Sequence, residues 1–160
     1  MSYGRYFEEL EPGQEFRHWP GRTITEFDDT LFSLMSMNQH PLHSDEHFAA
    51  KTQHGRRLVE GPLVIALVIG ISQADTGGRA LATLEYRDIR HLSPVFHGDS
   101  IYAESVILNR EERDAVSGIV TIASRGLNQR GEVVVTLDRV IVVPKQPAVE
   151  AHRRESAVRD

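Results

Sequence analysis

An asparagine and two histidines lie within six residues of one another, at Asn38, His40 and His43, on either side of Pro41. The ordinary pKa of imidazole lies near neutrality, so a histidine can take up and return a proton at pH 7. The Asn38 amide can orient a water molecule but cannot exchange protons usefully. The segment therefore predicts water chemistry with His43 as the base and His40 as a second candidate. The alternative is structural, with His43 in a cap or a core and Asn38 ending a helix.

Other chemistries fit the sequence less well. The chain contains no cysteine, which excludes thiolate zinc sites, disulfides and cysteine nucleophiles. His43 and His47 could share a helix face near Asp45 and Glu46, but Pro41 and the missing HExxH-like pattern argue against a metal site. There is no Gly-x-Ser-x-Gly elbow and no glycine-rich phosphate loop. The remaining histidines are predicted to be surface residues: His18, His47, His54, His91, His97 and His152.

Two further features could bind a ligand. Arg56 and Arg57 could pair with phosphates or with a substrate carboxylate, or could belong to a solvated loop. Gly61 opens a segment of apolar residues, and the free N–H groups at a helix start favour negative charge. Glycine also lets a ligand approach the backbone closely. The Gly61 N–H is therefore our candidate donor to a developing oxyanion.

The apolar segment itself predicts a long buried helix over about residues 61–75. Pro62 suits a first helical turn, and Gly77-Gly78 would end the helix. A helix that is apolar all round must be buried on most sides. An earlier helix is expected from a capping box at Thr25 and Asp28 to about Met37. A short one is expected over 44–51, capped by Ser44 or Asp45.

The rest of the pattern predicts strands. We expect a short strand over 22–27 and long ones over 81–91, 100–110, 118–126 and 132–143. The last alternates well, with Arg139 as the one exception on its apolar face. An antiparallel sheet covered by one buried helix is an α+β layout. Residues 1–143 would form one domain, and the charged, aperiodic stretch 144–160 a flexible tail.

Composition narrows the class of partner. The chain has 160 residues and a formal net charge of −5, which argues against nucleic acid as the main partner. No apolar run reaches the roughly 18 residues of a membrane span, so no membrane partner is expected. The first ten residues lack an apolar signal core, and the cytoplasm is the expected compartment.

Two stretches resemble the MaoC-like group of enoyl-CoA hydratases and dehydratases. Residues 38–43, Asn-Gln-His-Pro-Leu-His, resemble its Asp-x-Asn-Pro-(Leu/Ile)-His motif, and residues 94–99 look like its Pro-Val-x-x-Gly-Asp turn. Residues 58–63 are similar to the segment that opens its central helix. The resemblance implies a hot-dog fold, in which a curved antiparallel sheet wraps a long helix. It also implies homodimers, or larger homo-oligomers built from dimers, with sites at the subunit boundary. The substrate would be an acyl-CoA thioester, with CoA entering as part of the substrate and no separate cofactor.

The chain departs from the motif at two positions. Asn38 stands where the family usually has a catalytic aspartate, and His40 where it usually has asparagine. This pattern resembles a subgroup linked to hydration of mesaconyl-CoA, methylmalyl-CoA or itaconyl-CoA. Without the aspartate, His43 must serve both proton roles, or another acid must help. The nearby candidates are His40, Asp45 and Glu60. Two alternatives stay open: an acyl-CoA thioesterase, and a degenerate acyl-CoA-binding or scaffold subunit.

Overall fold

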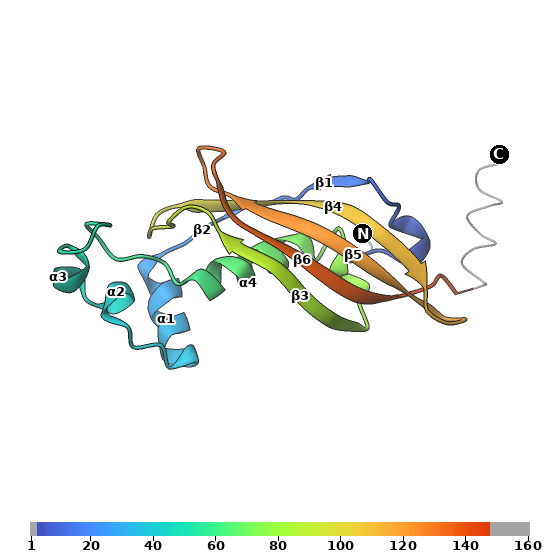
Figure 1. The fold of residues 1–160 in the computed structure, drawn as a ribbon, viewed down its shortest axis with the longest axis horizontal. Coiled ribbons are helices and arrows are strands. Elements are labelled where there is room, and N and C mark those ends of the chain that lie inside the picture. Colours follow the sequence, from blue (N-terminus) through green and yellow to red (C-terminus); the bar gives the residue numbers. More distant parts are fainter. Residues whose placement is uncertain (1–2, 148–160) are drawn as a thin grey trace.

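The computed structural model describes residues 3–147 of the chain, and its centre is a six-stranded antiparallel sheet (Figure 1). The order along the main path is β1-β4-β5-β6-β3, and β2 also pairs with β4. The strands are β1 (Glu15–Arg17), β2 (Arg22–Thr23), β3 (Ala82–His91), β4 (Ser100–Glu112), β5 (Ser117–Leu127) and β6 (Val133–Pro144). The four long strands confirm the predicted ones to within a few residues.

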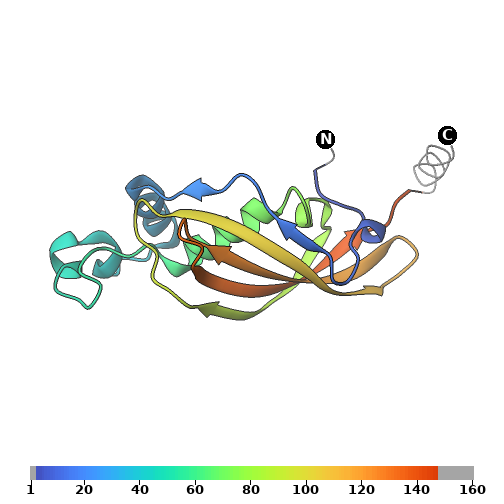
Figure 2. The ribbon, with the colours of Figure 1, turned by 90° about the horizontal axis from the view of Figure 1, so that it is seen from above.

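One helix covers a face of this sheet, and three more lie beyond one end of it. The helix α4 (Gly61–Ser72) runs along the sheet, whereas the other helices extend past the sheet's end (Figures 1 and 2). These are α1 (Glu26–Ser36), α2 (Pro41–Ser44) and α3 (Glu46–Ala49). Two 3-10 turns complete the chain, η1 (Phe7–Glu9) and η2 (Gly77–Arg79). The α+β prediction is therefore confirmed.

Several predicted boundaries were wrong near the N-terminal half. The strand expected over 22–27 ends at Thr23, because Thr25 and Asp28 form the predicted capping box and α1 begins at Glu26. The backbone hydrogen bond from Thr25 holds the pKa of Asp28 below its usual value. β1 was not predicted, since three residues are too few to show alternation.

At the C-terminal end, the proposed tail begins inside the sheet, because Pro144 is the last residue of β6. Residues 148–160 lie outside the described part.

The short helix expected over 44–51 is α3, with Asp45 as its cap, and a second short helix that was not predicted, α2, precedes it. Asp45 has an extended backbone between them, and its side chain accepts from the Phe48 N–H to cap α3. His40 caps α2, because its Nδ1 accepts from the Leu42 N–H at 3.1 Å. Two consecutive caps therefore fold this segment into a compact corner instead of a continuous helix.

The helix α4 is shorter than predicted. It ends at Ser72, whose carbonyl oxygen accepts from the Thr76 N–H and hydroxyl in a following turn. Only Val64, Val68 and Ser72 are buried, so a single stripe of the helix faces the sheet. Its opposite side, including Ala66 and Gly70, is exposed in the single chain. The flanking residues are partly buried against the core, so the helix is covered on most sides within one copy: Leu63, Ile65, Leu67, Ile69 and Ile71.

Arg139, the exception on the apolar face of β6, is buried with 1% of its surface exposed. Its guanidinium donates to Ser72 Oγ at 2.8 Å and lies 3.4 Å from Thr76 Oγ1. Burial lowers the pKa of Arg139 from its ordinary value. The C-terminal end of α4 favours a positive charge, which explains a cation at this place in the core.

Leucines on β6 and β4 provide a test of the core. Leu137 is 1% exposed in the cluster beneath α4, whereas Leu108 is 49% exposed. We expect Leu137→Ala to lower the free energy of unfolding by about 2–5 kcal/mol, because it leaves a cavity. Leu108→Ala should change it by less than about 0.5 kcal/mol. Urea denaturation measures both, and equal effects would contradict the assigned core.

Candidate active site

The segment 26–57, which holds α1, α2 and α3, lies beside the first turn of α4 (Figures 1 and 2). It places Asn38 and His43 together on the wall of a cavity of about 240 Å³. The same wall includes Ser33, Ser44 and Arg57. Two of the three predicted catalytic side chains therefore share one hollow near Gly61. His40 is not among the residues that line it.

His43 is held in one tautomer by the backbone. Its Nδ1 lies 2.9 Å from the carbonyl oxygen of Leu58. A carbonyl oxygen can only accept, so Nδ1 carries the proton and donates. The neutral ring then has an unprotonated Nε2 with no hydrogen-bond partner among the described residues. This arrangement leaves an acceptor nitrogen for a bound water.

Asn38 has a fixed amide orientation. Its Nδ2 donates to Glu60 Oε2 at 2.8 Å, and its Oδ1 accepts from the His40 N–H at 3.2 Å. In the reversed amide, Oδ1 would face the Glu60 carboxylate and Nδ2 would face the His40 N–H. A carboxylate cannot donate and a backbone N–H cannot accept, so neither hydrogen bond could form. One N–H of Asn38 remains for the cavity.

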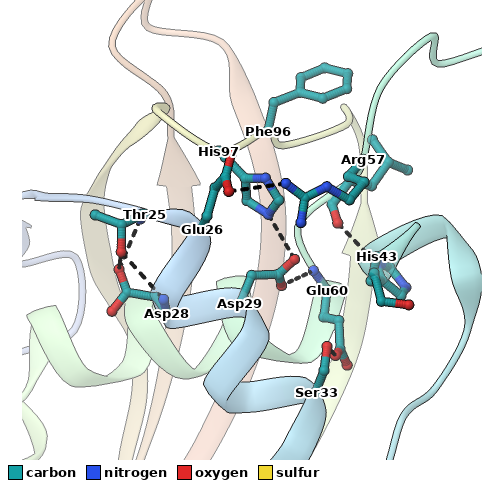
Figure 3. Close-up of polar contacts among 12 residues, drawn as sticks. Thr25, Glu26, Asp28, Asp29, Ser33, His43, Arg57, Glu60, Phe96 and His97 are labelled. Carbon is teal, nitrogen blue, oxygen red and sulfur yellow. Dashed lines mark hydrogen bonds and ion pairs between the residues drawn. The ribbon is translucent and has the colours of Figure 1, made fainter. Parts of the chain in front are cut away.

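Two buried carboxyl groups connect α1 to the start of α4 (Figure 3). Asp29 Oδ1 accepts from the Glu60 N–H, and Asp29 Oδ2 accepts from His97 Nε2, both at 2.9 Å. Glu60 Oε1 accepts from Ser33 Oγ at 2.6 Å. Asp29 and Glu60 are each only 1% exposed. The site thus rests on contacts among three elements distant in sequence.

The sequence interpretation did not include Asp29 or Ser33. The two are four residues apart on α1, so they lie on the same helix face. That spacing was the available signal, but nothing in the pattern showed that this face would be covered. Glu60 was considered only as a nearby acid.

His40 has mainly a structural position. It is exposed, caps α2 through Nδ1, and its ring lies 6.0 Å from that of His43, centroid to centroid, in an edge arrangement. A second edge contact joins it to Phe48. These contacts orient the corner that carries His43.

The two arginines differ. Arg57 is bound to carboxylates, with Nε 2.7 Å from Glu46 and an Nη 3.1 Å from Glu26. The hydrogen bond to Glu46, with a smaller contribution from Glu26, raises the pKa of Arg57 above its ordinary value. Arg56 lies over the Phe96 ring, 3.7 Å from its centroid. Among the described residues it has no carboxylate partner, so Arg56 is the arginine still available to an anionic group.

Gly61 begins α4, and His91 lies against it. A Cβ at position 61 would meet the imidazole of His91, 2.7 Å from Cε1 and 2.8 Å from Nε2. None of the hydrogen bonds of the described residues uses the Gly61 N–H, which stays available to a ligand. The prediction that His91 is exposed is correct, but the ring also covers the first turn of the helix.

Two histidines were wrongly expected on the surface. His18 is 4% exposed, and its ring bridges Asp75 at 2.7 Å and Ser105 at 2.9 Å. This order resembles a hydrolytic triad, but Ser105 is buried and its hydroxyl already contacts both His18 and Ser124. His97 is largely covered beside Asp29. His47 is exposed, His54 is half-buried, and His152 lies outside the described residues.

Other features of the described residues add no second site. Within residues 3–147 no group of three or more His, Cys, Asp or Glu side chains is placed to hold a metal ion. None of the helices in that range is long and apolar enough to cross a membrane. A hollow of about 360 Å³ lies across β1, β4 and β5. Among the charged residues that line it, Glu104 forms ion pairs with both Arg17 and Arg125, as on a solvated surface.

Comparison with solved structures defines the class. A MaoC domain protein from Chloroflexus aurantiacus superimposes with a TM-score of 0.88 at 30% identity, over 92% of this chain and 42% of that one. A Mycobacterium tuberculosis protein with a double hotdog fold matches with a TM-score of 0.83 over 91% of this chain and 46% of that one. At 22% identity it shows the fold alone. The chain is therefore a hot-dog protein, as predicted.

Sequence comparison then gives the family. The profile described as the MaoC like domain matches residues 7–126. A mesaconyl-CoA hydratase from Cereibacter sphaeroides is 33% identical over 144 residues, 89% of this chain and 42% of that protein. An (R)-specific enoyl-CoA hydratase from Aeromonas caviae is 30% identical over 138 residues, 86% of this chain and 98% of that protein. The chain belongs to the MaoC-like domain family. It spans less than half the length of the mesaconyl-CoA hydratase.

The contact between Gly61 and His91 can be tested by a double-mutant cycle. We expect Gly61→Ala to be destabilising in the native background, because the added methyl displaces the ring, and less so in His91→Ala. The coupling should be about 0.5–3 kcal/mol in thermal or urea unfolding. Gly70→Ala is the matched control, since a Cβ there meets nothing within 4 Å. It should stabilise α4 by roughly 0.5–1 kcal/mol in both backgrounds, and a Gly61 cycle without coupling would contradict the contact.

Proposed function

We propose that the protein catalyses reversible hydration of an enoyl-CoA thioester. The observation that carries the proposal is the His43 tautomer, with Nδ1 bound to Leu58 and Nε2 left as an acceptor beside Asn38. The names of the relatives from Cereibacter sphaeroides and Aeromonas caviae support the same reaction class.

In this mechanism His43 is the general base. Its Nε2 takes a proton from water as the water oxygen bonds to the β-carbon of the substrate. The electron pair of the double bond moves toward the thioester oxygen, where the Gly61 N–H and the start of α4 stabilise the negative charge. The protonated His43 then returns this proton to the α-carbon, which completes the addition, and the reverse sequence releases water.

The preferred substrate is a short branched or dicarboxylic acyl group. This follows from the resemblance to the mesaconyl-CoA hydratase, and the available guanidinium of Arg56 is suited to a phosphate of CoA or to a substrate carboxylate. CoA arrives as part of the substrate, and the proposed chemistry needs no separate cofactor or metal.

The proposed assembly is a homodimer that pairs through β3. In the described chain β3 pairs only with β6, so its outer edge is open for backbone hydrogen bonds. Exposed apolar side chains lie along it and at its ends: Leu81, Leu84, Tyr86, Ile89 and Leu92. The uncovered apolar side of α4 also needs a cover. A second copy related by a two-fold axis meets both requirements.

Charges on this edge should separate the two copies. We expect the double variant Leu84→Glu, Ile89→Glu to raise the dimer dissociation constant at least about tenfold, since it buries unpaired carboxylates. Sedimentation equilibrium or light scattering measures this. Leu108→Glu, a similarly exposed leucine on β4, should leave the mass unchanged. A native protein that is monomeric at micromolar concentration would contradict this interface.

Two alternatives predict different products. A hot-dog thioesterase would use a water held by Asn38 to attack the thioester carbon and would release free CoA. A degenerate module would bind acyl-CoA without turnover. The retained His43 geometry favours turnover. Hydration removes the conjugated double bond of the substrate, whereas the thioesterase reaction releases free CoA.

The assay follows crotonyl-, mesaconyl- and itaconyl-CoA with the purified protein. We expect loss of the conjugated thioester absorbance without release of thiol. Because the base is removed, His43→Ala should lower kcat by about 10²- to 10⁴-fold with the fold intact by circular dichroism. His47→Ala is the control on an exposed histidine of α3. Thiol release would indicate the thioesterase, and binding without either signal the degenerate module.

A further inference from the structure

Glu60 is a buried ionisable group in contact with two residues of the cavity wall, and the proposed mechanism does not use it. We propose that it is a positioning residue, which fixes the hydrogen-bond polarity of Ser33 and Asn38 around the water that His43 activates. This inference rests on the proposed hydratase function. It adds Ser33, which contacts the water, and Glu60, which acts on the water through Ser33 and Asn38.

The environment of Glu60 is unusual for a carboxylate. It is 1% exposed, and among the described residues no lysine, arginine or histidine forms an ion pair with it. Its oxygens accept only from Ser33 Oγ at 2.6 Å and Asn38 Nδ2 at 2.8 Å. A carboxylate buried on two neutral donors is costly to keep, which argues for a role beyond packing.

The two donors are both residues that line the cavity, whereas Glu60 itself is not. A serine hydroxyl has one proton. Ser33 donates this proton to Glu60, so it presents only lone pairs to the cavity. Asn38 must turn Nδ2 toward Glu60, because Oδ1 is held by the His40 N–H. Its second amide proton is then left for the cavity. Glu60 therefore acts through its two neighbours.

The resulting set matches one water molecule. The water can donate one proton to His43 Nε2 and the other to Ser33 Oγ, while a lone pair accepts from Asn38 Nδ2. One lone pair remains to attack the β-carbon. As the carbon–oxygen bond forms, the proton moves to His43 and the double-bond pair moves to the thioester oxygen. His43 then returns the proton to the α-carbon, so atoms and charge balance without a proton from Glu60.

The structure also separates Glu60 from the other nearby groups. His40 caps α2 and Asp45 caps α3, both on the exposed side of the corner. Only Glu60 contacts Asn38 from the buried side. It is also fixed at its backbone, where its N–H donates to Asp29.

A carboxylate–amide exchange tests the pair. Asn38→Asp would set two carboxyl groups against each other, and Glu60→Gln would turn an amide N–H toward Ser33 and reverse its hydroxyl. In the double variant Asn38→Asp, Glu60→Gln the new amide donates to position 38 and accepts from Ser33. The contacts among positions 33, 38, 40 and 60 then return with the roles of 38 and 60 exchanged, but position 38 presents a carboxylate oxygen to the cavity in place of an amide N–H.

We expect each single variant to lower kcat about 10- to 100-fold, because the water loses its orientation. The double variant should recover the thermal stability that the single variants lose but not their kcat, because position 38 then offers the water no N–H. Acyl-CoA binding, measured by calorimetry with a saturated thioester, should stay within about threefold in all three, since the changes lie behind the water. Glu111→Gln removes an exposed carboxylate near the far end of β4 and should leave kcat unchanged.

Ser33→Ala keeps the test independent of folding losses at position 38. It should lower kcat by a similar factor in the native background and add little in Glu60→Gln, since both remove the same acceptor. Unchanged kcat in Glu60→Gln, or native kcat in the double variant, would overturn the positioning role and leave the hydratase function standing. A native protein that hydrates none of the enoyl-CoA substrates would overturn both.

Discussion

The paired burial of Asp29 and Glu60 at the start of α4 is the constraint on which the site depends. Neither carboxyl group is matched by a lysine or arginine among the described residues, so both rely on hydrogen-bond donors. Those donors come from α1, the turn at residue 97, the loop at residue 38 and the backbone of Glu60 itself. A buried carboxyl group left without a donor is strongly penalised, so these separate segments are held in one arrangement.

This constraint also explains why the end of α4 suits a reaction that develops negative charge. The free N–H groups and dipole of the first turn stabilise nearby anions, and the Glu60 carboxylate takes part of that field. None of the hydrogen bonds of the described residues uses the Gly61 N–H. A histidine and a fixed amide line one cavity, and Gly61 follows Glu60, which contacts that amide. Only Asn38 and His43 were joined by sequence motif.

The sequence predicted what local chemistry determines. Hydrophobic alternation gave the four long strands, and the capping box gave the start of α1. It could not predict what depends on a distant partner. His18 and His97 appeared to be surface residues because their partners, Asp75 and Asp29, are far along the chain. Ser33 was missed for the same reason. Ser44 and Asp45 were both possible caps of the short helix, because two competing caps cannot be ranked from composition, and the structure uses Asp45.

The exposed side of α4 is where a second copy would contact the helix. An apolar sequence shows that a helix will be covered, but it does not show whether the cover comes from the same chain. Here one stripe faces the sheet, the flanking residues are partly buried, and Ala66 and Gly70 are exposed, while the outer edge of β3 is open. That edge ends at His91, whose ring covers Gly61. A partner paired along β3 would therefore lie beside the proposed oxyanion donor. In the proposed dimer, assembly and the dryness of the active site would follow from the same contact.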